Sequence, residues 1–144
     1  MVPKVITKAQ KVMVFGTFDI LHAGHRSFLR NAKAYGKHLT VVIGRDLNVT
    51  KYKKKAPFQK EDKRLLHVKE LSFVDEAILG RIDHNYEIII KNIKPDVICL
   101  GYDQDDFGLR EVIKRKFPKI KIFTLEAYKP ELYKTSILRK DFEI

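Results

Sequence analysis

The feature that most constrains the fold is a short apolar run followed at once by a glycine and two histidines. Val12–Phe15 contains no polar residue and ends at Gly16, a pattern typical of a strand buried on both faces of a parallel sheet. His22 and His25 follow, just before the helical spacing of apolar residues in Arg26–Tyr35. We therefore expect both imidazoles at a strand-to-helix corner.

A corner of this kind has a physical use, because the N–H groups in the first turn of a helix are unpaired and carry partial positive charge. They attract phosphate, and Gly24 between the histidines removes a side chain from its path. Each imidazole can donate a hydrogen bond to a phosphate oxygen, and as imidazolium it can offset the charge on a departing pyrophosphate. A helix cap or a packing role is the alternative interpretation of the same spacing.

The longer string G-T-F-D-I-L-H-A-G-H, residues 16–25, resembles the signature of the HxGH nucleotidyltransferase superfamily. That superfamily includes cytidylyltransferases, archaeal FAD synthases and pantetheine-phosphate adenylyltransferases. The resemblance implies that His22 and His25 are catalytic and contact the nucleotide. It also implies that the neighbouring residues Gly16, Thr17, Phe18, Ala23 and Gly24 bind the nucleotide.

The rest of the chain alternates short apolar runs with helical patterns. Further strands are predicted at Leu39–Ile43, Glu76–Leu79, Val97–Leu100 and Lys121–Leu125, and further helices at Lys60–Leu71, His84–Ile93, Leu109–Phe117 and Ser136–Phe142. Strands and helices in alternation predict an α/β fold, a doubly wound parallel sheet of about five strands. The resemblance implies the Rossmann-like form of HUP-type nucleotidyltransferases.

Length and composition bound the class of protein. A chain of 144 residues suits one domain, so we expect an N-terminal arm at residues 1–10 and a nucleotidyltransferase domain at residues 11–144. No window approaches the roughly 18 consecutive apolar residues of a membrane span, and no secretory signal is recognisable, so a cytoplasmic location without membrane contact is expected. Cys99, the only cysteine, lies in an apolar run and is expected to be a buried hydrophobe.

The net charge of +11 predicts attraction to polyanions but does not choose between nucleic acid, acidic membranes and small phosphorylated molecules. The basic run Lys51–Lys55 is open to three interpretations: a solvated loop, a nucleic-acid contact, or a mobile loop that closes over a triphosphate. Nucleic acid is the less favoured partner, because Tyr52 is the only aromatic residue in the run. The resemblance implies that a cation near this loop acts on the phosphates, and the candidates are Arg45, Lys51, Lys53, Lys54 and Lys55.

Two further segments extend the resemblance. The string P-D-V-I-C-L-G-Y-D-Q, residues 95–104, is similar to the corresponding segment of archaeal FAD synthases, and it implies that Asp103 contacts the ribose, the base or a metal ion. Residues 128–136 resemble, imperfectly, the second signature of the family, which adds Tyr128, Thr135 and Ser136 to the nucleotide site. The form R-T-x-G-I-S-T-T found in cytidylyltransferases is absent, which counts against CTP.

The residues at the corner suit positioning and charge neutralisation, with no serine or cysteine nucleophile required. We expect direct in-line attack of an acceptor phosphate on a nucleoside triphosphate. The resemblance implies an FMN adenylyltransferase, or FAD synthase, with ATP and FMN as substrates, and a homodimer. We expect Mg²⁺ or another divalent cation on the phosphates, and no metal site built by the protein, because the sequence has no dense carboxylate cluster. Two alternatives stay open: a cytidylyltransferase using CTP and glycerol 3-phosphate or a related phosphorylated alcohol or sugar, and a basic nucleic-acid-binding module without turnover. The flavin pocket is not identified, and the stacking candidates are Phe58, Tyr102, Phe107 and Tyr128.

Overall fold

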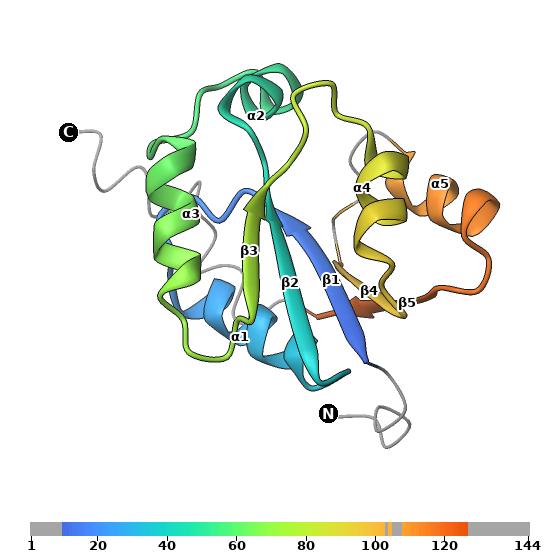
Figure 1. Ribbon diagram of the computed structural model, residues 1–144. Coiled ribbons are helices and arrows are strands. Elements are labelled where there is room, and N and C mark those ends of the chain that lie inside the picture. The colour runs from blue at the N-terminus through green and yellow to red at the C-terminus, as the bar shows by residue number, and fades with distance from the viewer. Residues whose placement is uncertain (1–9, 103, 105–107, 127–144) are drawn as a thin grey trace.

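The structure, a computed structural model, describes residues 10–102, 104 and 108–126. Its single sheet has five parallel strands in the order β3-β2-β1-β4-β5 (Figure 1). The strands are β1 Lys11–Gly16, β2 His38–Ile43, β3 Glu76–Leu79, β4 Val97–Gly101 and β5 Lys121–Leu125. The helices are α1 Ala23–Lys33, α2 Asp46–Lys53, α3 Glu61–Lys69, α4 Tyr86–Ile93 and α5 Leu109–Lys116. This confirms the predicted doubly wound parallel sheet.

The sheet separates two apolar layers, and the alternating side chains of β1 supply both of them. Val12 and Val14 face one layer, which is built with residues of α1 and α3. Met13 and Phe15 face the other layer, which is built with residues of α4 and α5. These four side chains are at most 5% exposed, so β1 is the buried centre of the fold, as its unbroken apolar run predicts.

The chain changes direction across the sheet beside β1, which lies between β2 and β4. In open parallel sheets ligands bind at the carboxyl ends of the strands, beside this kind of reversal. Gln104, just after β4, bridges the two strand ends. Its Nε2 donates to the Phe15 carbonyl at 2.8 Å, and its Oε1 accepts from the Gly101 N–H at 3.1 Å. The segment after β4 therefore reaches the same sheet edge as the histidine corner, as expected.

Two predicted boundaries are wrong. Helix α1 begins at Ala23 and not at Arg26, because His22 caps it. The predicted loop Lys51–Lys55 is helical in its first part, because it contains the end of α2, Asp46–Lys53, a helix that the sequence did not predict. The other described elements agree with the prediction to within two residues.

The remaining expectations have different outcomes. Cys99 is fully buried, as predicted, and burial raises the pKa of its thiol to about 12. None of the helices in the described part of the chain has the length and hydropathy needed to cross a bilayer. The arm at residues 1–10, apart from Gln10, and the helix Ser136–Phe142 lie outside the described residues and stay predictions.

Candidate active site

The two histidines form the cap of α1 and hold each other in place. His22 is the N-cap residue, and its Nδ1 accepts a hydrogen bond from the Gly24 N–H at 3.0 Å. The Nδ1 of His25 accepts from the His22 N–H at 3.3 Å, which completes a reciprocal capping box. Because Nδ1 is the acceptor in both rings, each neutral imidazole carries its proton on Nε2. The corner thus combines the capping role with two Nε2–H donors.

The two rings are stacked, and their surroundings lower both pKa values. Their centroids are 3.8 Å apart and their planes are inclined by 28°. Burial, followed by the charge of Arg26, lowers the pKa of His22 to about 4. Burial, followed by the charges of His22, Lys53 and Arg26, lowers the pKa of His25 to about 3. Both pKa values lie well below neutral pH, so the neutral form of each ring is favoured, and the positive charge expected on these rings when pyrophosphate leaves stays a prediction.

Phe18 provides the wall against which His25 packs. Its ring is buried and meets His25 edge-on, with centroids 5.5 Å apart and planes at 74°. A Cβ at Gly16 would lie 2.5 Å from Cε2 of this ring, so only glycine lets the ring fold over the end of β1. Phe18 and Ile20 both have positive φ, 53° and 54°, which is unusual for side chains of this size. The turn therefore holds a conformation that its surroundings must stabilise.

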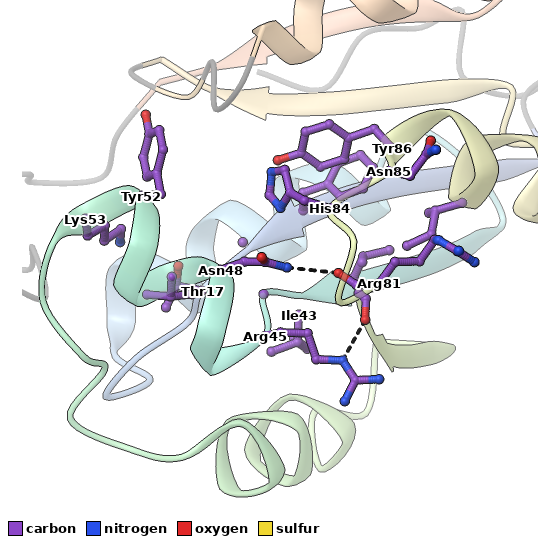
Figure 2. Close-up of a pocket in the computed structure, with 17 residues that line it drawn as sticks. Thr17, Ile43, Arg45, Asn48, Tyr52, Lys53, Arg81, His84, Asn85 and Tyr86 are labelled. Carbon is purple, nitrogen blue, oxygen red and sulfur yellow. Dashed lines mark hydrogen bonds between the residues drawn. The ribbon is translucent and has the colours of Figure 1, made fainter.

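A cleft that is open to solvent lies beside this corner at the carboxyl ends of β1, β2 and β3 (Figure 2). Its floor includes Gly16, Gly44 and Gly80, one at or just after the end of each strand. The Gly44 N–H donates to the Gly16 carbonyl at 2.9 Å, which joins the first two strand ends. One wall is α2, and the other is the segment that leads into α4. Thr17 lines the cleft as well, so the cleft and the histidine corner share the turn after β1.

Among the predicted cations, Lys53 is the one that lies at both the cleft and the histidine corner. It lines the cleft, and its charge is among the causes that lower the pKa of His25. Lys51, Lys54 and Lys55 are exposed and are not part of the cleft lining. Arg45 lines the cleft but is engaged in structure, because its Nη1 pairs with Glu61 Oε2 at 3.0 Å.

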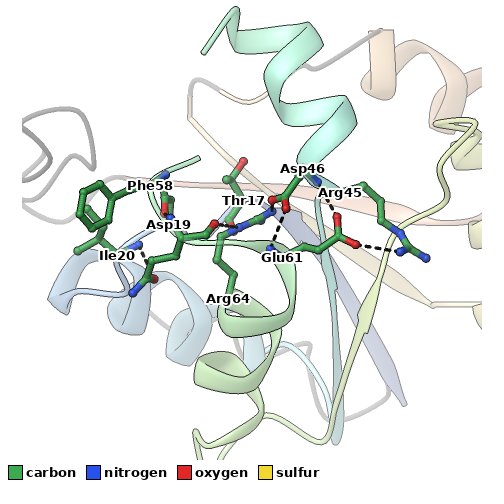
Figure 3. A network of polar contacts seen from close by, with 9 residues as sticks. Thr17, Asp19, Ile20, Arg45, Asp46, Phe58, Glu61 and Arg64 are labelled. Carbon is green, nitrogen blue, oxygen red and sulfur yellow. Dashed lines mark hydrogen bonds and ion pairs between the residues drawn. The ribbon is translucent and has the colours of Figure 1, made fainter. Parts of the chain in front are cut away.

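Asp19 and Arg64 form a buried network that ties the turn after β1 to the segment between α2 and α3 (Figure 3). Asp19 accepts from two backbone N–H groups, that of Phe58 at 2.6 Å and that of Gln59 at 2.9 Å. Arg64, fully buried, donates to the Thr17 carbonyl at 2.8 Å, to the Gln59 carbonyl at 3.0 Å and to an Asp46 carboxylate oxygen at 2.6 Å. Gln59 also accepts from the Ile20 N–H through its side chain, at 3.2 Å.

The starts of α2 and α3 cap each other within the same network. The Asp46 N–H donates to Glu61 Oε1 at 2.8 Å, and the Glu61 N–H donates to Asp46 Oδ2 at 3.2 Å. Each carboxylate thus lies at the N-terminus of the other helix, where it is favourable. Through Asp46 and Arg64, helix α2 and its Lys53 are fixed relative to Thr17 and the histidine corner.

The structure assembles part of the predicted nucleotide site. The residues of the HxGH string lie together at the corner: Gly16, Thr17, Phe18, His22, Ala23, Gly24 and His25. The other predicted nucleotide contacts, Asp103, Tyr128, Thr135 and Ser136, lie outside the described residues. No cluster of three or more His, Cys, Asp or Glu side chains suited to a metal ion occurs within the described ranges.

The sequence interpretation missed Arg64 and Asn48. Arg64 has a detectable signal, because it precedes Val68 and Leu71 by four and seven residues and so lies on the inward face of its helix. Asn48 has no such signal, because the sequence predicts that the apolar Leu47 is buried and the polar Asn48 exposed, and the structure shows the reverse. It is buried, and its Nδ2 donates to the Arg81 carbonyl at 2.9 Å.

Comparison with known proteins adds independent findings. Residues 13–141 match the family model described as cytidylyltransferase-like. The chain is 42% identical over 120 residues to the FAD synthase of Aciduliprofundum boonei, covering 82% of this chain and 79% of that protein. It is 45% identical to the FAD synthase of Ferroglobus placidus, over 82% of this chain and 77% of that protein.

Two solved structures are also similar. The first is the crystal structure of a protein from Thermoplasma volcanium titled lipopolysaccharide core biosynthesis protein. It has a TM-score of 0.74 and 37% identity, and the match covers 84% of this chain and 99% of that one. The second is pantoate-beta-alanine ligase from Francisella tularensis, with a TM-score of 0.52 and 18% identity over 98% of this chain and 73% of that one, a likeness of fold alone.

Proposed function

The chain belongs to the cytidylyltransferase-like family, and from that premise we propose that it is an FMN adenylyltransferase, or FAD synthase. It would transfer AMP from ATP to FMN and release pyrophosphate. The observation that carries this proposal is the identity of 42% and 45% to two proteins named FAD synthase, over about four fifths of the chain. The predicted alternative with CTP and glycerol 3-phosphate is not favoured by these relatives.

The reaction proposed is a single displacement at phosphorus. An oxygen of the FMN phosphate forms a bond to the α-phosphorus of ATP, and the bond from that phosphorus to the α,β-bridging oxygen breaks. The acceptor phosphate has a second pKa near 6, so it is largely ionised at neutral pH and needs no general base. Catalysis then rests on alignment and on stabilising charge as pyrophosphate leaves.

We assign the alignment to the histidines and the charge to Lys53. The capping box directs the Nδ1 atoms of His22 and His25 to the backbone, so their Nε2–H groups are the donors for phosphate oxygens. Neutral rings can stack at 3.8 Å without the repulsion that two imidazolium charges would suffer. Lys53 supplies a positive charge beside them.

The remaining substrate contacts belong to the same proposal. Asp103, Tyr128, Thr135 and Ser136, which lie outside the described residues, would contact ATP. Mg²⁺ or another divalent cation would be held mainly by phosphate oxygens and water, which suits an ion that keeps its waters and needs few protein ligands. It would supply charge neutralisation on the triphosphate.

The decisive assay offers ATP or CTP with FMN or glycerol 3-phosphate and follows pyrophosphate release together with the nucleotide product. FAD formed from ATP and FMN supports the proposal. Turnover of CTP with glycerol 3-phosphate and none with FMN would replace it. Salt-sensitive binding of oligonucleotides without any turnover would favour the nucleic-acid-binding alternative.

Lys53 can be tested against its neighbour on the same helix. Lys53→Gln should lower kcat with ATP and FMN by about tenfold or more, while Lys51→Gln, which removes the same charge outside the cleft, should change it less than twofold. Equal kcat values for the two variants would remove the role of Lys53.

A cytoplasmic location and a homodimer are also proposed. The buried single thiol is compatible with a reducing compartment. Sedimentation equilibrium at micromolar concentration tests the dimer, and a monomer mass would reject it.

A further inference from the structure

Resting on the proposed function, we infer that the isoalloxazine ring of FMN binds in the cleft between α2 and the start of α4. Tyr52 would flank the ring on one side, and His84 and Tyr86 on the other. None of these three residues is among the stacking candidates that the sequence offered. The inference begins from continuity, because Gly16 and Thr17 line the cleft and also begin the histidine turn.

Aromatic groups stand on two sides of the cleft opening (Figure 2). Tyr52 lies in the last turn of α2 and is 43% exposed. On the α4 side, the His84 ring meets Tyr86 edge-on with centroids 4.7 Å apart, and Tyr86 meets Phe15 in the same way at 4.9 Å. The second wall is therefore anchored in the sheet through a chain of three rings. A planar heteroaromatic ligand can stack on such walls.

The distance between the walls is fixed at their base. The Asn48 side chain of α2 donates to the Arg81 carbonyl, and Arg45 Nε donates to the Gly80 carbonyl at 2.7 Å. Both bonds connect the α2 side to the chain that leads from β3 to α4, as the dashed lines of Figure 2 show. A site that is already ordered loses less entropy when a flat ligand enters.

The charged side chains around the cleft indicate how FMN is oriented in it. Arg81 forms a bidentate pair with Asp83 at 2.8 and 2.7 Å, and Arg45 pairs with Glu61, so both guanidinium charges are compensated. Lys53 brings positive charge to the end of the cleft near His25. The acceptor phosphate is thus favoured at the Lys53 end, with the ring toward α4. The phosphate of a phosphorylated polyol could also pair with Lys53, but such a ligand has no ring to stack on the aromatic walls.

The test measures FMN binding and steady-state kinetics on the same variants. Tyr52→Ala removes one wall, Tyr52→Phe keeps its ring, and Leu47→Ala truncates a 64% exposed residue of the same helix outside the cleft. His84→Asn tests the other wall, since asparagine tolerates the positive φ of 58° at this position. Binding is followed by quenching of flavin fluorescence with Mg²⁺ and α,β-methylene-ATP present. The chain has no tryptophan, so tyrosine side chains are the expected protein quenchers, and a titration of FMN with α,β-methylene-ATP alone measures the quenching caused by adenine.

We expect Tyr52→Ala and His84→Asn to raise the Kd and KM for FMN by about tenfold, with the KM for ATP changed less than twofold. Leu47→Ala should behave like the wild type, and Tyr52→Phe, which keeps the ring, should retain most of the FMN affinity that Tyr52→Ala loses. FAD synthesis with FMN constants unaffected by either wall variant overturns this inference and leaves the proposed function standing. FMN quenching that depends on Tyr52 in a protein that makes no FAD supports the inference and rejects the function. Absence of FMN binding and of FAD synthesis rejects both.

Discussion

Replacing Arg64 with methionine tests whether the buried network holds the site together. The substitution keeps most of the apolar stem and removes the guanidinium group, which makes three hydrogen bonds to three different segments. The Thr17 and Gln59 carbonyls then lose a charged donor, and Asp46 loses its cationic partner. Each of these groups lies next to the turn after β1 or at the start of α2 or α3.

The size of the effect follows from burial. Removing one member of a buried ion pair costs about 3–5 kcal/mol, because the partner is left without compensation. The Asp46 side chain is 36% exposed, so water takes over part of its solvation, and the lower end of that range, about 3 kcal/mol, is expected. A chain of 144 residues has an unfolding entropy of about 0.3 kcal/mol per kelvin, so Tm should fall by about 10 °C.

Thermal unfolding by calorimetry measures this shift, and Lys63→Met is the matched control, because Lys63 is the exposed neighbour of Arg64 on α3. The double variant with Asp46→Asn should be little less stable than Arg64→Met alone, since the two residues share one interaction. At a temperature where Arg64→Met and Lys63→Met are both folded, kcat should fall about ten- to a hundredfold for Arg64→Met and stay unchanged for Lys63→Met. The reason is that Arg64 no longer fixes the turn after β1 relative to α2. Equal Tm values for Arg64→Met and Lys63→Met would refute the reasoning.

Three further predictions concern single groups. Burial lowers the pKa of His25 to about 3, so between pH 6.5 and pH 3 the unfolded chain binds a proton that the folded chain does not. The free energy of unfolding should therefore fall with falling pH by up to about 1.4 kcal/mol per pH unit. Denaturant titrations at several pH values should show a weaker pH dependence of that free energy for His25→Gln. Gly16→Ala should destabilise by about 1–3 kcal/mol in a urea melt because its Cβ meets the Phe18 ring, whereas Gly80→Ala, with 3.4 Å to the nearest atom, should cost less; the reverse order would contradict the contact geometry. Cys99 should react with a colorimetric disulfide reagent only after unfolding, since burial raises its pKa to about 12, and fast labelling of the folded protein would disprove its burial.

The strands were predictable because their signal is local. Val12–Phe15 and Val97–Leu100 are apolar without interruption, and runs of this length that end at a glycine are typical of strands covered on both faces. A glycine stands at the end of β1 and of β4, which fixed their carboxyl ends in the sequence. From parallel strands with helical crossovers, the edge that carries the site follows.

Helix α2 was not predicted from the sequence, because its burial is set by tertiary contacts. Leu47 is 64% exposed, while its neighbour Asn48 is buried with its amide bonded to Arg81. Apolar periodicity therefore gives no signal over Asp46–Lys53, and the lysines in its last turn resemble a loop. The capping carboxylate of Glu61 comes from another helix, so the start of α2 has no local partner in the sequence.

The candidate site also has a part with a local sequence signal and a part that depends on tertiary contacts. The histidine corner is encoded within ten residues, so its position could be predicted from sequence. The network that supports it could not, because Asp19 bonds the Phe58 N–H 39 positions away and Arg64 bonds the Thr17 carbonyl 47 positions away. Pairings at that separation depend on the order of strands in the sheet.

The charge state of the corner shows why this division matters for mechanism. Two isolated imidazoles would titrate near pH 6.5, and from sequence alone they can be assigned charge at the moment pyrophosphate leaves. Folding stacks them at 3.8 Å, buries His25 beside Phe18 and turns each Nδ1 toward a backbone N–H, so that the neutral form with the proton on Nε2 is favoured. In this form the histidines donate directed hydrogen bonds to phosphate oxygens, and another group supplies the positive charge beside the leaving pyrophosphate. Lys53 is placed to supply it because Arg64 and Asp46 fix the helix that carries it.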